Sequence, residues 1–354
     1  MSRGFSCLAP KSSRRPSKYH LFVPDATRPA TPEKLHPVVH AITSNWRRLT
    51  GGKSVRDADR RTLLACSAGA DSSALVLALA TQPASVVVAH IVHDMRPETD
   101  SAKCLEAARF LADSLGVHFD SERIEAKPAG GNYEAAARAR RYAALEKIAL
   151  RHGCRFIATA HHAEDQLETI LLRLIRGTGP KGLASIRAKR TLPGGLTVVR
   201  PMLPLSREQA RHLCTDCAWK WSEDASNADL SHKRAALRAA VLPGLLQIEP
   251  RAALRAVDAA RLSLLAADHL GRAAGELALA AKTADPERFD RSVLRSADRI
   301  VLLTWLYTLK TSAPLRVLES IAGAIRSKSG EPRAWSVGPC TFRLERDRLC
   351  VLRK

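Results

Sequence analysis

The sequence lacks any apolar run long enough to cross a membrane. No stretch approaches the roughly 18 uninterrupted apolar residues that a transmembrane helix needs, although 45% of the 354 residues are hydrophobic. That share is sufficient for a sizeable core, and the length exceeds that of one ordinary compact domain. We therefore expect a soluble, cytoplasmic protein of at least two domains that does not contact membranes.

Acidic residues are scarce relative to basic ones. The chain has 35 Asp and Glu against 56 Lys and Arg, which gives a net charge of +21. From Thr169 to Arg207 it contains eight Lys or Arg and no acid at all. This balance favours a polyanionic partner, above all nucleic acid. A basic run of this kind is also typical of a plain solvated face, so the run alone does not decide.

Two further features are missing from the chain. The eight cysteines are scattered without the spacing of a disulfide framework, and Cys214 and Cys217 form a lone C-x-x-C with no second pair. The first 24 residues contain no acid and no apolar core of a secretory signal. They predict a disordered basic arm over residues 1–35, while an organellar transit peptide has the same composition.

Short β-rich runs alternate with helical patterns along the first two thirds of the chain. The helical patterns have apolar residues spaced three and four apart. Strict alternation indicates βαβ units, and hence an α/β fold with a doubly wound parallel sheet. The expected strands are 63–66, 85–92, 117–124, 156–160 and 197–201, and the expected helices are 71–81, 99–115, 132–151 and 163–176.

The composition changes after Asn227, where Ala- and Leu-rich helical sequence replaces the alternation. Only the end of the chain, with CTFRLERDRLCVLR, returns to a strand-like pattern and predicts a short β hairpin. We expect a sheet domain over residues 36–230, a helical domain over 231–330 and a small β element over 331–354.

A turn of small and hydroxylated residues follows the first expected strand. In an open parallel sheet, ligands bind at the carboxyl ends of the strands, where the next helix begins and its N–H groups attract phosphate. Small residues let a phosphate approach, although no Walker A or G-x-G-x-x-G pattern is present. The Asp71 carboxylate would repel phosphate unless a metal ion bridges the two. Alternatively, Asp71 or Ser72 is an ordinary N-cap of the helix that follows. The turn consists of Ser67, Ala68, Gly69, Ala70, Asp71 and Ser72.

The stretch ATAHHAEDQLET, residues 158–169, repeats this arrangement after a later strand. His161, Asp165 and Glu168 are spaced four and three apart, so they share one helix face. Three interpretations remain open: a metal site, acids that interact with the helix dipole, or a carboxylate pair that binds an ammonium group.

Several motifs together resemble one enzyme family. The SAGADS turn is similar to the pyrophosphate loop of the ATP-pyrophosphatase (PP-loop, adenine nucleotide alpha-hydrolase-like) superfamily. Within it, further stretches resemble tRNA(Ile)-lysidine synthases and follow that family's order over residues 60–250. They are HIVHDMR (90–96), GNYEAAARARRYAAL (131–145), ATAHHAEDQLET, LIRGTGPKGLASI (174–186), RPML (200–203), DASN (224–227) and RAALRAAVLPGLL (234–246).

The resemblance implies an enzyme that uses ATP and Mg2+ to join free L-lysine to tRNA(Ile) with a CAU anticodon. The C2 oxygen of the wobble cytidine is adenylated, and the lysine ε-amine then displaces AMP. On this basis residues 67–72 cradle the ATP phosphates and Asp71 holds Mg2+. Asp165 and Glu168 bind lysine, with His161 or a carboxylate as the proton acceptor.

The same resemblance assigns basic residues to the RNA or to phosphate. Arg138 and Arg141 are candidates for the cytidine or its phosphate, while a salt bridge from Arg138 to Glu134 is equally compatible. The remaining candidates are Arg176 and Lys181, in a Gly-rich loop over phosphate, and Arg234 and Arg238, on a helix that faces the tRNA backbone.

Two departures and one alternative accompany the resemblance. Ala68 stands where the family usually has Gly, which costs on the order of 1 kcal/mol if that position requires positive φ. Ala235 stands where Asn is usual. The alternative function is tRNA thiolation within the same superfamily, with Cys214 and Cys217 as the reactive pair. The sequence leaves the oligomeric state open.

Overall fold

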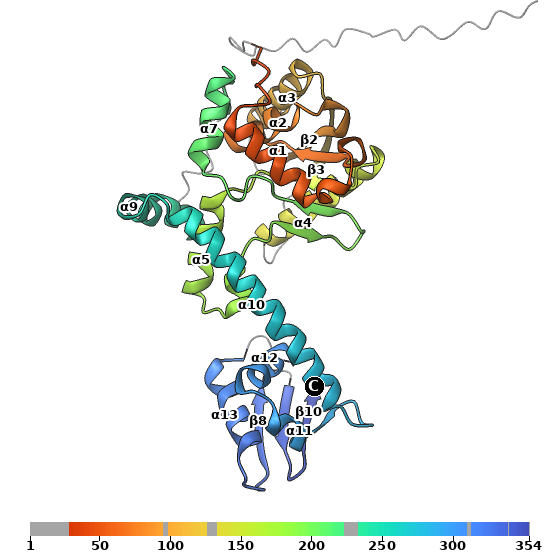
Figure 1. Cartoon of the computed structure of the whole chain (residues 1–354), viewed down its shortest axis with the longest axis vertical. Helices are drawn as coiled ribbons and strands as arrows, with labels where there is room; N and C mark the ends of the chain where they lie inside the picture. Colours follow the sequence, from red (N-terminus) through yellow and green to blue (C-terminus); the bar gives the residue numbers. More distant parts are fainter. Residues whose placement is uncertain are drawn as a thin grey trace, which may run out of the picture.

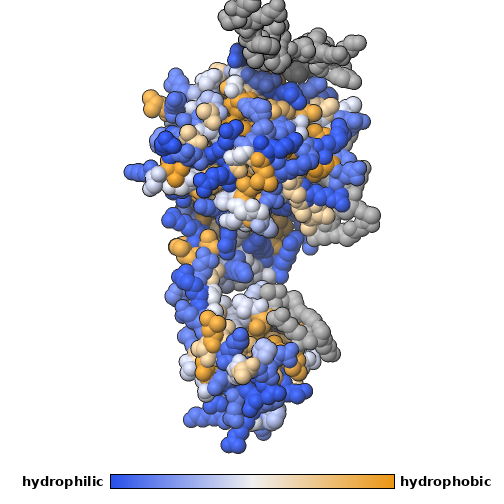
Figure 2. All heavy atoms as spheres, turned by 90° about the vertical axis from the view of Figure 1, so that its right-hand side faces the viewer, coloured by the Kyte–Doolittle hydropathy of each residue, from blue (hydrophilic) through white to orange (hydrophobic). Residues whose placement is uncertain are grey.

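The computed structural model describes residues 28–94, 98–125, 133–222, 233–309, 313–338 and 340–353. These residues form a larger and a smaller lobe, joined by the long helix α10 (Ala252–Ala280) (Figure 1). Figure 2 shows a narrow waist between the lobes and a mostly hydrophilic face on the smaller one. Most of the expected arm, residues 1–27, lies outside the described residues.

The larger lobe is built on a six-stranded sheet with the order β3-β2-β1-β4-β6-β5. All neighbouring strands are parallel except β5, which is antiparallel to β6. The expected parallel sheet is therefore confirmed, and its five expected strands lie within two residues of the observed limits. The strands are β1 Thr62–Ala65, β2 Val86–His93, β3 His118–Ile124, β4 Phe156–Ala158, β5 Lys189–Thr191 and β6 Thr197–Val199.

Helices cover both faces of this sheet because successive strand residues point to opposite sides. On β1, Leu64 packs in one buried cluster with α1, α2, α3 and α7, while Leu63 packs in another with α4. The helices are α1 Pro37–Leu49, α2 Ala70–Leu79, α3 Glu98–Ser114, α4 Tyr133–Arg151, α5 Ala163–Ile175, α6 Pro180–Leu183 and α7 Arg207–Asp216. Short 3-10 turns are η1 Gly52–Ser54, η2 Asp57–Asp59 and η3 Pro83–Ser85.

A second group of helices packs on α5 rather than on the sheet. It consists of α8 (Lys233–Ala236), the π-helical turn η5 (Leu237–Val241), α9 (Leu242–Ile248) and the start of α10. Leu167 of α5 shares a buried cluster with Leu237 and Leu242. This contact holds the α8–η5 segment beside α5.

The smaller lobe combines three helices with a four-stranded antiparallel sheet of order β7-β10-β9-β8. The expected hairpin is β9–β10, and two more strands extend it. Helices and strands share one buried cluster that includes Trp305 and Phe342. The elements are β7 Arg288–Asp290, α11 Arg291–Ser296, α12 Arg299–Leu309, α13 Leu315–Arg326, β8 Arg333–Val337, β9 Cys340–Leu344 and β10 Arg348–Arg353. The domain limits 36–230, 231–330 and 331–354 stay predictions.

None of the helices in the described ranges is long and apolar enough to span a membrane.

A buried arginine ties the smaller lobe together. Arg291 is 1% exposed, and its guanidinium donates to the backbone carbonyls of Ala324, Ser327 and Ser329 at 2.9 Å and of Arg346 at 3.1 Å. Carbonyls at a helix C-terminus have no partner within the helix. Arg291 therefore satisfies the end of α13 and fixes it to the β9–β10 turn.

Replacing Arg291 with methionine should destabilise the smaller lobe by on the order of 3 kcal/mol, because several buried carbonyls lose their donor at once. Urea unfolding followed by circular dichroism measures the change. Arg316→Met, at an exposed position on the same α13, should change stability by less than about 0.5 kcal/mol. Equal stability of the two variants would contradict the clamp role of Arg291.

Candidate nucleotide and cation site

Two loops meet where the strand order reverses between β1 and β4. The first joins β1 to α2 and the second joins β4 to α5. Because β1 and β4 are parallel neighbours, both loops lie at the same carboxyl edge. This edge is the usual ligand position in a doubly wound sheet.

Serine hydroxyls shape the β1–α2 loop. The Ser67 N–H donates to Ser72 Oγ at 3.1 Å, and Ser72 Oγ donates to the Gly69 carbonyl at 3.0 Å. The Ser67 hydroxyl lies 3.2 Å from the same Ser72 oxygen. Ser72 thus folds back to hold the loop and does not cap α2, whose N-cap is Gly69.

Positions 68 and 69 differ in what the backbone requires. Ala68 has φ = 65°, the left-handed region that glycine adopts without strain, and it is fully buried. The question left open by the sequence is therefore answered: position 68 needs positive φ, and alanine there costs on the order of 1 kcal/mol. Gly69 has an ordinary φ of −77°.

The fold also leaves space for a side chain at position 69. A Cβ there would lie 3.8 Å from Ser67 Oγ and 3.9 Å from the Ser222 carbonyl, both ordinary van der Waals distances. Neither the backbone nor the packing demands glycine at this position. A ligand that approaches the loop closely would demand it.

Asp71 places an unpaired carboxylate oxygen at the loop. Asp71 Oδ1 is buried without a hydrogen-bond partner among the described residues, and Oδ2 lies 3.4 Å from His162 Nε2. Asp71 is not the N-cap of α2. Within the described ranges no three His, Cys, Asp or Glu are placed to hold a metal ion. A Mg2+ ion at Asp71 fits this arrangement because Mg2+ commonly takes one carboxylate and fills its sphere with phosphate and water.

His162, which the sequence analysis did not select, connects the two loops. It is the N-cap of α5 and is 3% exposed. Its ring nitrogens face three carboxylates: Glu164 at 2.9 Å, Asp71 at 3.4 Å and Asp165 at 3.6 Å. Burial alone would lower the pKa of His162, but hydrogen bonds to Asp71 and Glu164 and the charge of Asp165 raise this pKa to about 10. His162 is therefore an imidazolium at neutral pH.

His161 behaves in the opposite way. Burial, with the charges of Arg200 and Arg138, lowers the pKa of His161 to about 3 despite the neighbouring Asp165. Its Nδ1 lies 2.9 Å from the Thr159 hydroxyl. A neutral imidazole with so low a pKa hydrogen-bonds well but is a weak base.

Asp165 and Glu168 lie together and face two guanidinium groups. Arg234 Nε donates to Glu168 Oε2 at 2.8 Å, and Arg238 donates to Asp165 Oδ1 at 3.1 Å and also to Glu168. Although burial raises the pKa of Asp165, the charge of His162, a hydrogen bond from the His162 backbone N–H and the charge of Arg234 together lower this pKa. Asp165 is thus ionised, and in this structure Arg234 and Arg238 contact the acidic pair.

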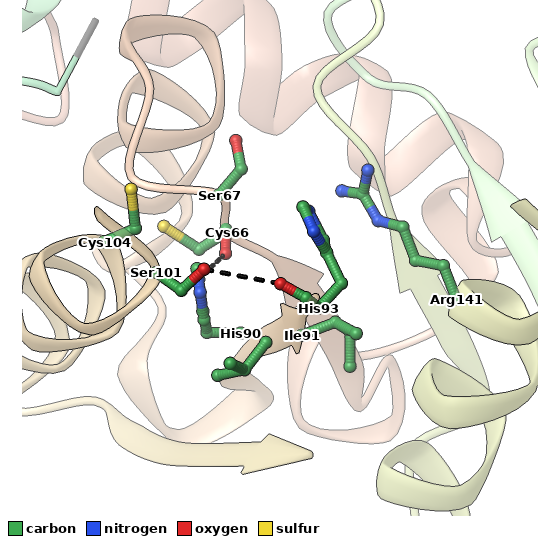
Figure 3. A pocket seen from close by; sticks show the side chains of 9 residues that line it. Cys66, Ser67, His90, Ile91, His93, Ser101, Cys104 and Arg141 are labelled. Carbon is green, nitrogen blue, oxygen red and sulfur yellow. Dashed lines mark hydrogen bonds between the residues drawn. The ribbon is translucent and has the colours of Figure 1, made fainter. Parts of the chain in front are cut away.

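The other predicted phosphate ligands are distributed around this edge. Arg141 of α4 lines a cavity of about 170 Å³ with Ser67, His90 and His93, toward which it reaches in Figure 3. Arg176 and Lys181 are both exposed. Arg176 is the C-cap of α5, about 16 Å along the helix axis from Asp165, and Lys181 is on α6. The structure does not bring these two to the acidic pair.

Some of the recognised motifs cannot be placed. Residues 95–97, 126–132 and 223–232, with part of HIVHDMR and all of DASN, lie outside the described residues. So does the Glu134 side chain, the alternative partner of Arg138. Arg138 itself donates to the Tyr142 hydroxyl at 3.4 Å.

The cysteine pair does not form a reactive site. Cys214 is fully buried and Cys217 is 2% exposed. Burial raises their pKa values to about 12 and about 11, so both are protonated thiols at neutral pH. They belong to the buried cluster around α7, where the Cys214 thiol lies 3.4 Å from the Ala70 carbonyl at the start of α2.

Comparisons with known proteins agree with this geometry. Residues 41–245 match the PP-loop domain family. A tRNA(Ile)-lysidine synthase of Alkalilimnicola ehrlichii is 40% identical over 220 residues, 61% of this chain and 45% of that protein. One of Nostoc sp. is 34% identical over 249 residues, 69% of each chain. The U34-tRNA thiolase NcsA of Methanococcus maripaludis, solved with its 4Fe–4S cluster, shares the fold with a TM-score of 0.50 at 16% identity, over 64% of this chain and 78% of that one.

The larger lobe is accordingly a PP-loop domain of the kind that binds ATP. Within that class, the chain belongs to the tRNA(Ile)-lysidine synthase family. It spans less than half the length of the Alkalilimnicola relative and about two thirds of the Nostoc one.

Gly69→Ala should leave the free energy of unfolding within about 1 kcal/mol of the parent value, because the fold accommodates the methyl group. It should raise the Kd for ATP at least about tenfold, about 1.4 kcal/mol, since the added methyl fills the surface that phosphate approaches. Isothermal titration calorimetry and urea unfolding measure the two quantities.

The matched control is Gly323→Ala, on α13 in the smaller lobe, where a Cβ would meet nothing within 4 Å. This variant should bind ATP like the parent protein. An unchanged ATP affinity in Gly69→Ala would show that phosphate does not approach the loop at this residue.

Proposed function

We propose that this protein ligates lysine to C2 of the wobble cytidine of tRNA(Ile) with a CAU anticodon, and releases AMP and pyrophosphate. One observation carries the proposal: the loop from Ser67 to Ser72, which we call the phosphate loop, lies close to the acidic pair Asp165 and Glu168. His162 contacts both of them, through Asp71 and Asp165. A nucleotide and a cationic amino acid would therefore bind side by side. The names of the relatives agree with this chemistry.

The nucleotide half of the site is the loop from Ser67 to Ser72. Its backbone N–H groups and the start of α2 provide positive potential for ATP phosphates. Asp71 would hold Mg2+, which neutralises charge on the phosphates when bound. The free Asp71 Oδ1 supports this assignment.

The amino-acid half is the pair Asp165 and Glu168. The pair already contacts two guanidinium groups, which is the chemistry that an ammonium group needs. Lysine would compete with Arg234 and Arg238 for the carboxylate oxygens and attack as a neutral amine. His161 would position the lysine, and either His161 or a carboxylate of the pair would accept its proton, because His161 and Asp165 both have lowered pKa values.

The RNA would be held largely by charge. The net charge of +21 suits a phosphate backbone, and binding of this kind weakens as salt rises. Arg138 and Arg141 on α4 remain our candidates near the target base, which must leave its stack to be modified. Arg176 and Lys181 stand exposed where a longer RNA would pass.

A single assay tests the reaction. The protein is incubated with ATP, Mg2+, a tRNA(Ile) transcript with a CAU anticodon and labelled lysine. Label should enter the tRNA only when all components are present, and a transcript with a CAC anticodon is the control. ATP consumption without transfer of label to the RNA would refute ligation.

Asp165→Asn should raise the KM for lysine at least about tenfold, because one carboxylate charge facing the ammonium group is lost. The KM for ATP should change less than about twofold. Asp258→Asn, at an exposed position on α10, is the control and should behave like the parent. An unchanged KM for lysine in Asp165→Asn would place the amino acid elsewhere.

Replacing Cys214 and Cys217 together with alanine should leave the rate of lysine transfer within about twofold of the parent, because both thiols are protonated and serve packing. Thermal unfolding checks that the variant is folded. A folded variant that no longer modifies tRNA would favour thiolation instead.

A further inference from the structure

Three arginines are buried in the described part of the chain, and one of them is not satisfied. Arg60 donates to Asp57 and to several carbonyls, and Arg291 donates to the carbonyls at the end of α13. Arg200 is 4% exposed and donates to the Arg187 carbonyl at 2.5 Å, but its Nε has no partner. A buried guanidinium is usually paired, so Arg200 is an exception within this fold.

Two further arginines lie close to Arg200 and share a tyrosine with it. The guanidinium carbons of Arg138 and Arg190 lie 5.2 and 5.1 Å from the centre of the Tyr142 ring, a cation–π distance. Arg200 also interacts with Tyr142. We call Arg138, Tyr142, Arg190 and Arg200 the Tyr142 cluster.

The Tyr142 cluster carries three positive charges, and none of its four members is acidic. Among the described residues, no carboxylate forms an ion pair with any of its arginines. Burial lowers the pKa of Arg200, and Arg138 and Arg190 lower it further despite the contact with Tyr142. Like charges in a partly buried place repel one another strongly, and a bound anion would relieve that repulsion.

The sheet places the Tyr142 cluster on the β4–β6 side of the site, near His161. Arg200 directly follows β6, and β6 pairs with β4, where Val199 accepts a hydrogen bond from Thr159. His161 feels the charges of Arg200 and Arg138. The cluster thus lies on the β4–β6 side of the site, while the β1 loop lies on the other side of β4.

We propose that the Tyr142 cluster binds a backbone phosphate of the RNA next to the nucleotide that is modified. This inference rests on the proposed function and adds a phosphate site that fixes the RNA against α4, β5 and β6. Arg138 and Arg190 are exposed, so a polymer can reach them from solvent. Tyr142 contacts all three guanidinium groups, two of them over its ring and Arg200 through a side-chain hydrogen bond, so it gathers them in one place.

A matched pair of variants on β5 tests the phosphate site. Successive strand residues point to opposite faces: Arg190 pairs with Val198, on the α4 side, and Lys189 pairs with Val199, on the other. Arg190→Gln and Lys189→Gln therefore remove the same charge from the same strand but from opposite faces. Both positions are exposed, so both variants should fold.

Fluorescence anisotropy measures the Kd of each variant for a labelled anticodon stem–loop RNA. The measurement is repeated at salt concentrations from about 50 to about 200 mM. Arg190→Gln should weaken binding about fivefold or more and reduce the slope of log Kd against log salt by about 0.7 to 0.9, as expected for one lost phosphate contact. Lys189→Gln should change both quantities by less than half as much. Equal effects of the two variants would overturn the proposal.

Arg200→Gln extends the test to the buried member. Its RNA affinity and salt slope should fall like those of Arg190→Gln, while its Kd for ATP should stay within about twofold of the parent. If ATP affinity falls in place of RNA affinity, the anion is a nucleotide phosphate and the proposal is wrong.

Lysine incorporation by the parent protein is measured separately. Failure of that reaction with an intact difference between Arg190→Gln and Lys189→Gln would refute the proposed function and leave the phosphate site standing.

Discussion

The contact between His162 and Asp71 is the interaction on which the rest of the site depends. A parallel sheet brings the ends of β1 and β4 together, but it does not by itself join the loops that follow them. The His162 imidazolium joins them, because it faces Asp71 from the first loop and Glu164 and Asp165 from α5. Its pKa is raised to about 10 because these carboxylates favour the charged imidazolium. The phosphate loop and the acidic pair consequently form one site.

Several residues around this site are in states that lower the stability of the fold. Ala68 keeps a left-handed conformation that a glycine would adopt more easily. Among the residues that the structure describes, one carboxylate oxygen of Asp71 and one guanidinium nitrogen of Arg200 have no hydrogen-bond partner. Unpaired buried groups of this kind are tolerated where a ligand completes them. The smaller lobe shows the contrast, since its buried Arg291 is fully satisfied by carbonyls.

Much of this arrangement could be predicted from the sequence, because it depends on local patterns. The spacing of apolar residues located five strands and four helices, and the SAGADS turn lies at the carboxyl end of β1, as expected for a ligand loop. Helices α1 and α6 and strands β5, β7 and β8 were missed. Elements of three or four residues such as β5, β7 and α6 carry little pattern, and α1 precedes the alternation. The sequence also contains two adjacent histidines, and only the direction of the chain at the N-cap of α5 turns His162 inward toward Asp71.

The long-range pairings could not be predicted. Arg234 and Arg238 were expected to face RNA, yet they contact Glu168 from 66 and 70 positions away, because Leu237 and Leu242 pack on α5. The Tyr142 cluster draws its members from α4, β5 and the end of β6, which only the folded sheet brings together. Whether position 68 needed glycine likewise depended on a backbone angle that the sequence does not contain.

A double-mutant cycle between Asp71 and His162 tests the link most directly. The free energy of unfolding is measured by urea denaturation, without nucleotide, for the parent, Asp71→Asn, His162→Gln and the double variant. We predict a coupling energy of at least about 1 kcal/mol, because the two groups contact each other in a buried place. Additive effects, within about 0.5 kcal/mol, would mean that the two loops are held together by something else.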